Sequence, residues 1–119
     1  MTSSAQMAKK RAFGYNKKSQ SSSALARCMP MAIWSSSLES YEDIYKAVTN
    51  DAEFTHPDQD VHDAIFIFTI AIKYLLDNPT DPDRASKAYD LALLESSRLD
   101  NYRKSYKNDI LEDEEKSLI

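Results

Sequence analysis

An all-α fold is predicted from three features of the sequence. Its longest apolar stretch, residues 64–72, contains no charged side chain and continues into Tyr74, Leu75 and Leu76, which makes it too long for an ordinary strand. The 119 residues include only one glycine, whereas β-rich folds and nucleotide-binding loops use several. Other segments carry apolar residues at spacings of three and four, as amphipathic helices do. We therefore expect about four helices packed around a buried central helix over residues 57–76.

The composition favours one globular domain. A chain of 119 residues can bury a modest core, and 42% hydrophobic with 29% charged residues is typical of soluble globular proteins. The single cysteine, Cys28, excludes an internal disulfide framework and is compatible with a reducing compartment, so we expect a cytoplasmic or other intracellular location. The central apolar stretch is too short, and too acidic at its start, for a membrane span. We therefore expect no membrane partner.

Charge is distributed unevenly along the chain. Residues 1–28 contain six bases and no acid, whereas residues 29–119 carry all 19 acids against nine bases. Such asymmetry can indicate a nucleic-acid-binding arm, an organelle transit peptide or a solvated terminus. Few aromatic residues are interleaved with the bases, so we do not expect a nucleic-acid partner. We expect a basic, Ser-rich, disordered arm over residues 1–20, a helical domain over residues 21–107 and an acidic tail over residues 108–119.

The first two expected helices precede the central one. Ser22 or Ser23 suits the N-cap of the first, and Pro30 should kink or break it. The face expected to pack on the core is formed by Leu25, Met29, Ile33 and Trp34. A second helix is expected from about residue 38 to residue 51, with Ser40 as a possible cap. Its apolar stripe consists of Tyr41, Ile44, Tyr45 and Val48.

The central helix is expected to begin at Pro57, because the missing N–H of proline costs nothing at the first helical position. Acids in its early turns favour the positive end of the helix dipole. Isoleucine and phenylalanine also favour strands, but the length of the pattern decides for a helix. Because the run is apolar on every side, the helix must be buried all round. We expect Phe66, Phe68 and Ile70, or their neighbours on both faces, to be mostly buried.

A last helix is expected from about residue 82 to residue 106. Asp81 would cap it, and Pro82 would take its first position. Its apolar residues are Ala85, Ala88, Tyr89, Ala92, Leu93, Leu99 and Tyr102. The like-charged block at residues 112–115 should be solvated.

The residues that could carry chemistry are few. His56 and His62 are six apart, which is not a metal-ligand spacing. Cys28 has no histidine nearby in sequence to activate it. The acids at residues 58, 60 and 63 lack the glycine and terminal glutamate of a calcium-binding loop. His56 precedes a helix, where it could cap the helix, make a core hydrogen bond, or contact an anion at the helix N-terminus.

Two segments in order carry a family resemblance. The first contains Ser19, Ala24, Leu25, Arg27, Pro30, Met31, Ala32, Ile33 and Trp34; the second is Thr55-His56 at the start of the long apolar helix. Together they resemble the ADP-ribosylglycohydrolase family, also called the dinitrogenase reductase-activating glycohydrolase family. That family carries Ser-x-Gly-Asn-Gly-x-x-Met-Arg-x-x-Pro before an apolar run, and later a Thr-His that opens a buried helix. The resemblance covers about residues 19–97 and implies a partial, orthogonal helical version of the family fold.

The chain also departs from the family pattern. Ser21, Ser22 and Ser23 stand where the family has Gly-Asn-Gly, and Ala26 stands for its methionine. Family enzymes hold two magnesium ions with a Thr-Asp-Asp and an Asp-x-Asp-Thr, neither of which occurs here, and family domains are more than twice as long. The resemblance therefore implies the middle of such a domain. We expect no cofactor in this chain and no catalytic or metal-ligating residue.

The resemblance implies hydrolysis of ADP-ribose glycosidic bonds as the family chemistry. For this chain we expect a truncated or degenerate copy that is inactive alone, so whether it is an enzyme at all stays open. Residues implied to contact ADP-ribose are Ser21, Ser22, Ser23 and His56, while Arg27 is expected to bind an acid rather than the ligand. Possible partners are ADP-ribose, an ADP-ribosylated protein, a complementing chain or a second copy. The alternative is a helical protein–protein interaction module.

Overall fold

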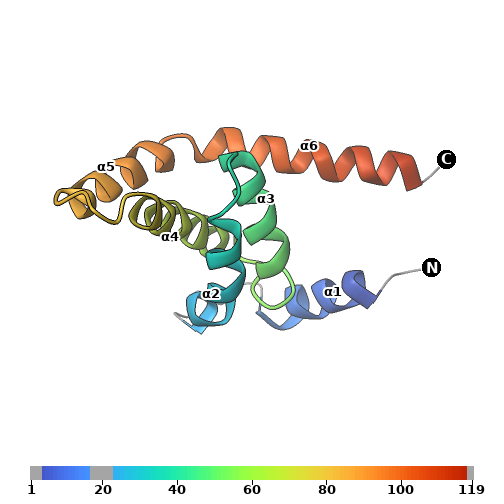
Figure 1. Ribbon diagram of the computed structural model, residues 1–119. Helices are drawn as coiled ribbons and strands as arrows, with labels where there is room; N and C mark the ends of the chain where they lie inside the picture. The colour runs from blue at the N-terminus through green and yellow to red at the C-terminus, as the bar shows by residue number, and fades with distance from the viewer. Residues whose placement is uncertain (1–3, 17–22, 118–119) are drawn as a thin grey trace.

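Helices account for nearly all of the described chain. The computed structural model describes residues 4–16 and 23–117, and within these ranges it contains six helices and no strand. The helices are α1 (Ser4–Asn16), α2 (Ser23–Ser35), α3 (Tyr41–Ala52), α4 (Gln59–Asp77), α5 (Arg84–Ser96) and α6 (Leu99–Ser117). The all-α prediction is confirmed, with more helices than the four expected. Figure 1 shows α2 and α3 crossing α4, with α5 and α6 along one side.

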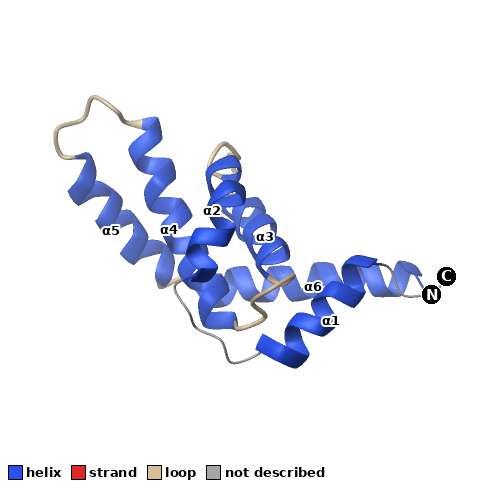
Figure 2. Ribbon diagram, turned by 90° about the horizontal axis from the view of Figure 1, so that it is seen from below, coloured by secondary structure: helices blue, strands red, loops and turns tan. Residues whose placement is uncertain are grey.

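α4 is the central helix of the fold, as predicted. It packs against α2, α3 and α5, and Figure 2 shows α5 running beside it. Phe66 and Ile70 are fully buried, but the burial predicted for Phe68 is wrong, because its side chain is 37% exposed. The start predicted at Pro57 is also wrong. Asp58 is the N-cap and its carboxylate accepts the N–H groups of residues 60 and 61, which leaves Pro57 in the preceding loop.

α3 supplies the aromatic centre of the core. Ser40 caps it, as expected, by accepting the N–H of Asp43. The predicted stripe is largely confirmed: Ile44, Tyr45 and Val48 are buried, and Tyr41 is half-buried. The ring of Tyr45 lies edge-on to Phe66, with 5.2 Å between their centroids, and stacks on Tyr102 of α6 at 6.0 Å. These contacts tie three helices together.

α2 packs with a different face from the one expected. Ile33 and Trp34 are exposed, whereas the smaller Cys28, Ala32 and Ser35 are buried. Small side chains on the inner face let α2 approach α3 and α4 closely. Pro30 lies inside α2 without interrupting it. At the end of the helix, Ser35, Ser36 and Ser37 donate their hydroxyls to the backbone carbonyls of residues 31, 33 and 34. The bonds from Ser36 and Ser37 satisfy carbonyls of the last turn, which lack partners within the helix.

The single helix expected over residues 82–106 is two helices, α5 and α6, broken at residues 97–98. Asp81 does not cap α5. Its carboxylate accepts the N–H of Asp83 and pairs with Lys87, and the helix starts at Arg84. Of the expected apolar residues only Ala88 and Tyr102 are buried. The acidic block expected in a tail lies within the last turns of α6.

Residues 4–16 form a helix where a disordered arm was expected. The segment contains alanine, methionine, glutamine and lysine, all good helix formers, and one glycine near its end. Lys9 joins α1 to the end of α3: it pairs with Glu53 at 3.2 Å and donates to Asn50 Oδ1 at 2.6 Å. None of the helices in the described ranges combines the length and hydropathy needed to cross a bilayer.

Candidate functional site

The implied ligand residues fall partly outside the described chain. Ser21 and Ser22 lie outside the described residues, and Ser23 is the first residue of α2, with a side chain that the structure does not describe. His56 lies in the loop between α3 and α4 and is half-buried. Ligand contact by these four residues therefore stays a prediction. The contacts that hold α2 and the His56 loop together lie within the described residues.

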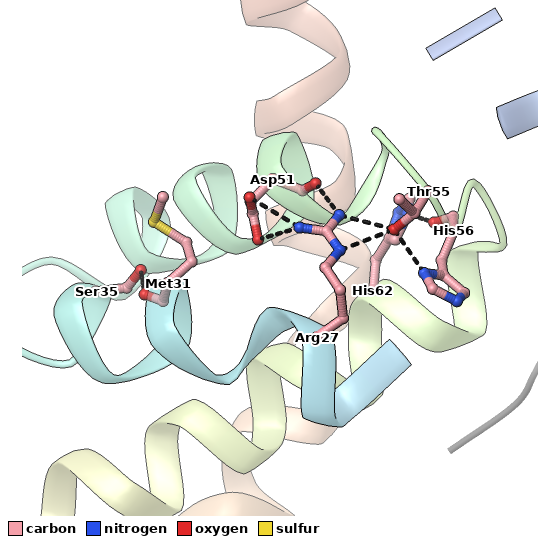
Figure 3. Close-up of polar contacts among 7 residues, drawn as sticks. All are labelled: Arg27, Met31, Ser35, Asp51, Thr55, His56 and His62. Carbon is pink, nitrogen blue, oxygen red and sulfur yellow. Dashed lines mark hydrogen bonds and ion pairs between the residues drawn. The ribbon is translucent and has the colours of Figure 1, made fainter. Parts of the chain in front are cut away.

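Arg27, one turn into α2, makes that connection (Figure 3). Its Nη1 donates to both carboxylate oxygens of Asp51 at 3.2 and 3.1 Å, and Nη2 donates to the Asp51 backbone carbonyl at 2.7 Å. Nε and Nη2 also donate to Thr55 Oγ1, at 2.9 and 2.7 Å. We call these contacts the Arg27 clamp. The expectation that Arg27 binds an acid is confirmed, and a cation at the C-terminal end of α3 is also favoured by the helix dipole.

The clamp continues into the two histidines. Thr55 Oγ1 lies 2.7 Å from His56 Nδ1, and His62 Nε2 lies 2.5 Å from the backbone carbonyl of His56. Because a carbonyl can only accept, His62 donates this bond. His62 is buried in the first turns of α4, so its bond fixes the loop backbone to that helix. The ring of His56 is thus held by Thr55 of the same loop, which Arg27 of α2 contacts in turn, and its main chain is held by His62 of α4.

The environment of His56 opposes its protonation. Partial burial lowers the pKa of His56, and the positive charge of Arg27 and the nearby His62 lower it further. A histidine with a depressed pKa is neutral at physiological pH. Any hydrogen bond that it donates to a ligand is therefore a bond from the neutral ring, rather than the stronger bond of an imidazolium.

The positive end of α4 is already occupied. The Asp58 carboxylate accepts the N–H of Asp60 at 2.8 Å and that of Val61 at 3.4 Å, so a ligand anion there would meet a negative charge. α2 differs, because its first turn contains no acid. Of the two helix N-termini near His56, that of α2 is the better suited to an anion.

The acids near the site do not fit the two magnesium ions used by the resembled family. Asp51 is held by the Arg27 clamp, and buried Asp63 accepts from Tyr45 Oη at 3.2 Å and pairs with Arg103. Magnesium needs carboxylates that are open to the ion and its waters. In the described part of the chain, no three His, Cys, Asp or Glu side chains lie close enough to hold a metal ion. Burial also raises the pKa of Cys28, which disfavours a thiolate nucleophile.

Two hollows border the His56 loop at Pro57. One, of about 210 Å³, lies between α3 and α6, and Thr49 and Arg103 are among the residues that line it. Thr49 Oγ1 and Arg103 Nε are buried and form no hydrogen bond within the described residues. The other, of about 360 Å³, is more open and is lined by Lys9, Lys10, Glu53 and Pro57. His56 is not among the residues that line either hollow.

Sequence reasoning missed three members of the site. Asp51 gave no signal, because its partner Arg27 lies 24 residues away. His62 was considered as a metal ligand and not as a backbone clamp. In the sequence Thr55 is marked only as part of a motif, although a threonine hydroxyl beside a histidine can orient the ring by a local hydrogen bond.

A model of the ADP-ribosylglycohydrolase family matches residues 2–117 of the chain. The match extends beyond the two segments on which the resemblance was based and includes all the residues of the Arg27 clamp. The comparisons with curated proteins and with solved structures found no match.

Proposed function

The chain belongs to the ADP-ribosylglycohydrolase family, and on this premise we propose that it binds ADP-ribose, free or attached to a protein, between the start of α2 and His56. The observation that carries the proposal is the Arg27 clamp, which holds α2 against Thr55 and His56. The two segments that carry the family resemblance meet at this contact, although Arg27 and Thr55 are 28 residues apart in sequence.

The ligand contacts follow from the chemistry of the two segments. Backbone N–H groups and hydroxyls of Ser21, Ser22 and Ser23 would face the diphosphate, and the N-terminus of α2 would add the positive end of its dipole. His56 would donate a hydrogen bond from its ring. Serine side chains take more room than the glycines of the family loop and should impede close approach of the ligand. We therefore propose a weak, millimolar-class affinity, equivalent to about 4 kcal/mol.

We propose that the isolated chain does not hydrolyse the glycosidic bond. Metal-assisted hydrolysis needs ligands that hold the ion and activate a water molecule, and this sequence has neither of the family's aspartate clusters. The acids that lie near His56 are engaged by arginines and backbone N–H groups. A degenerate or partial copy that keeps ligand recognition and lacks the reaction fits these observations.

Titration with ADP-ribose followed by NMR tests the binding proposal. Saturable shifts should be concentrated at the start of α2 and at residues 55–56, and His56→Ala should weaken them. Ser86→Ala is the control, because Ser86 is exposed at the start of α5, which follows the C-terminal end of α4, whereas the His56 loop precedes the N-terminal end of α4. Equal shifts in the native chain and in His56→Ala would remove His56 from the site, and no saturable shift would overturn the proposal.

Exposed apolar side chains favour a second candidate, a helical module that associates with another copy of itself. Trp34 is 59% exposed, and large apolar residues of α4 and α5, such as Leu76 and Tyr89, are also exposed. Exposed apolar patches mark interaction surfaces. Sedimentation velocity should then show a concentration-dependent dimer that Trp34→Ser weakens, whereas a monomer at all concentrations would contradict this candidate.

A further inference from the structure

The hollow of about 210 Å³ between α3 and α6 is lined by one face of each helix. Thr49 and Glu53 are four residues apart on α3, so they lie on the same side of that helix. Arg103 and Lys107 have the same spacing on α6. The volume is several times the roughly 30 Å³ that one water molecule takes up in the liquid. Lys107 is exposed, which leaves the hollow open to a small solute on the α6 side.

Thr49 has a buried hydroxyl that the fold leaves without a hydrogen bond. A helical threonine can donate to the carbonyl four residues earlier, as Thr69 does at 2.7 Å, whereas Thr49 Oγ1 forms no hydrogen bond within the described residues. Burial raises the pKa of Tyr45 to about 12, and the nearby Thr49 hydroxyl opposes this rise. However, Tyr45 Oη already donates to Asp63 at 3.2 Å and accepts from Gln59 at 3.0 Å. A buried donor without a partner costs free energy that a bound acceptor would recover.

Arg103 is held at its terminal nitrogens and unpaired at Nε. Its Nη2 pairs with buried Asp63, and its Nη1 donates to Asp100 Oδ1 at 3.0 Å. These two contacts fix the plane of the guanidinium. Nε, by contrast, is buried without a hydrogen-bond partner in the described part of the chain. Two residues with unpaired buried groups, Thr49 and Arg103, thus line the same hollow from opposite helices.

The charged side chains that line the hollow are positive on balance. Arg103 and Lys107 each carry a positive charge, and the one carboxylate of the lining, Glu53, already pairs with Lys9 of α1 at 3.2 Å. Buried His62 donates its Nε2 proton to a loop carbonyl. Lys107 forms no ion pair with any residue that the structure describes. An unpaired ammonium beside two unpaired groups that can donate favours an anion over a cation or a neutral solute.

We propose that this hollow binds a free oxyanion of the phosphate class, held by the Lys107 ammonium, Arg103 Nε–H and the Thr49 hydroxyl. A tetrahedral oxyanion has a separate oxygen for each of these three donors, and such charge-assisted bonds are strong. Because the Thr49 hydroxyl is buried, it reaches the ion by turning between the two rotamers that helical threonines adopt. Neither His56 nor any residue of α2 lines the hollow, so this site does not depend on the proposed ADP-ribose site.

Titration of the native chain with sodium phosphate at constant ionic strength and neutral pH, followed by ¹H–¹⁵N NMR, tests the site. The backbone amides of residues 49, 103 and 107 and the Arg103 Nε–H signal should shift together. They should saturate at millimolar phosphate, because water and salt screen a partly open site. Lys107→Met should raise the dissociation constant roughly tenfold, the factor that one charged hydrogen bond supplies. Lys104→Met is the matched control, because Lys104 is exposed on the same helix and does not line the hollow.

Thr49→Val tests the buried end of the site. Valine keeps the shape of threonine and removes the hydroxyl, so phosphate should bind several-fold more weakly. The free energy of unfolding in urea should not fall, because the substitution removes a polar group that has no partner in the fold. Weaker binding by an equally stable variant would therefore report the lost hydroxyl rather than a damaged fold.

Four outcomes would overturn the proposal. The absence of saturable shifts at residues 49, 103 and 107 would mean that the hollow holds only water. Equal weakening by Lys107→Met and Lys104→Met would reduce the response to the general charge of α6, and full affinity in Thr49→Val would remove the buried donor. Shifts at these residues with ADP-ribose but not with phosphate would assign the hollow to the nucleotide instead of a free ion. Because Lys107 is exposed, its variant should fold as the native chain does, and the comparison with Lys104→Met decides even if Thr49→Val is unstable.

Discussion

Replacing Phe66 by alanine tests the fold that supports the site. Phe66 is fully buried and packs edge-on to Tyr45, and its centroid lies 4.9 Å from that of Tyr102. Truncation of a buried phenylalanine leaves a cavity as well as losing burial, which costs about 3–5 kcal/mol. Loss of two aromatic contacts places Phe66→Ala toward the upper end of that range. For a chain of this length, the melting temperature should fall by about 15 °C.

Phe68 provides the matched control in the same helix. It is two residues away and 37% exposed, so Phe68→Ala should lose less burial and cost about 1–2 kcal/mol. Urea unfolding followed by circular dichroism would give both free energies of unfolding, and unchanged denaturant slopes would show that only stability has changed. Equal losses for the two variants, or a larger loss for Phe68→Ala, would refute the assignment of the buried face of α4.

Four further predictions concern the site and its surroundings. Alanine variants of Arg27 and Asp51, whose side chains are 34% and 21% exposed, should show a coupling free energy of about 1–2 kcal/mol in a double-mutant cycle; zero coupling would mean that water screens the pair. Because the pKa of His56 is lowered in the fold, its contribution to stability is present above about pH 6.5 and is lost as the pH falls below that value. In His56→Gln the free energy of unfolding in urea should therefore decrease less steeply on acidification. An unchanged acid dependence would contradict this. Burial beside Asp63 raises the pKa of Tyr45 to about 12. The contribution of Tyr45 to stability is therefore present below about pH 10 and declines as the pH rises toward 12. Tyr45→Phe should reduce this loss of stability at high pH, and absorbance of the Tyr45 phenolate near pH 10 would contradict the raised pKa. Calorimetric titration with magnesium chloride should show no tight stoichiometric site, and a two-metal isotherm of micromolar affinity would contradict the proposed absence of a metal centre.

The helical class and the face that α3 buries could be predicted because periodicity carries that information. In α3 apolar and polar residues alternate at helical spacing, so the burial of Ile44, Tyr45 and Val48 follows directly. In the middle of α4, over residues 64–72, nearly every position is apolar, so the pattern predicts burial without showing which side faces the core. Phe68 lies on a side that α2, α3 and α5 do not fully cover, and nothing in its sequence neighbourhood distinguishes it from Phe66.

The buried face of α2 shows a different limit. Its largest apolar residues, Ile33 and Trp34, predict a core-facing side by hydrophobicity, yet the helix packs through Cys28, Ala32 and Ser35. How closely two helices approach depends on the side chains of both partners. The pattern of one helix therefore does not show whether that helix buries the face with its largest side chains or the face with small side chains that allows close packing.

The sequence predicts what type of partner a site residue has, but not which residue that partner is. That Arg27 would bind an acid follows from its place within a helix, but the choice of Asp51 depends on how the end of α3 meets α2. The orientation of His56 depends on three groups at once, since Arg27 occupies Thr55 and Thr55 in turn faces the ring. Such a chain of hydrogen bonds exists only in the folded state and leaves no pattern in the sequence.

The charges around His56 bear on the proposal that this chain binds ADP-ribose without hydrolysing it. Asp51 is paired with Arg27, Asp58 caps α4, and Asp63 is buried against Arg103. Each of these carboxylates is held by a donor that the fold supplies, and releasing one to bind a metal would leave that donor without its partner, at a cost comparable to a lost charged hydrogen bond. On the proposed function, we therefore expect no hydrolysis by the isolated chain when magnesium is added. On the same proposal, hydrolysis would require acids that no arginine or backbone N–H group already holds.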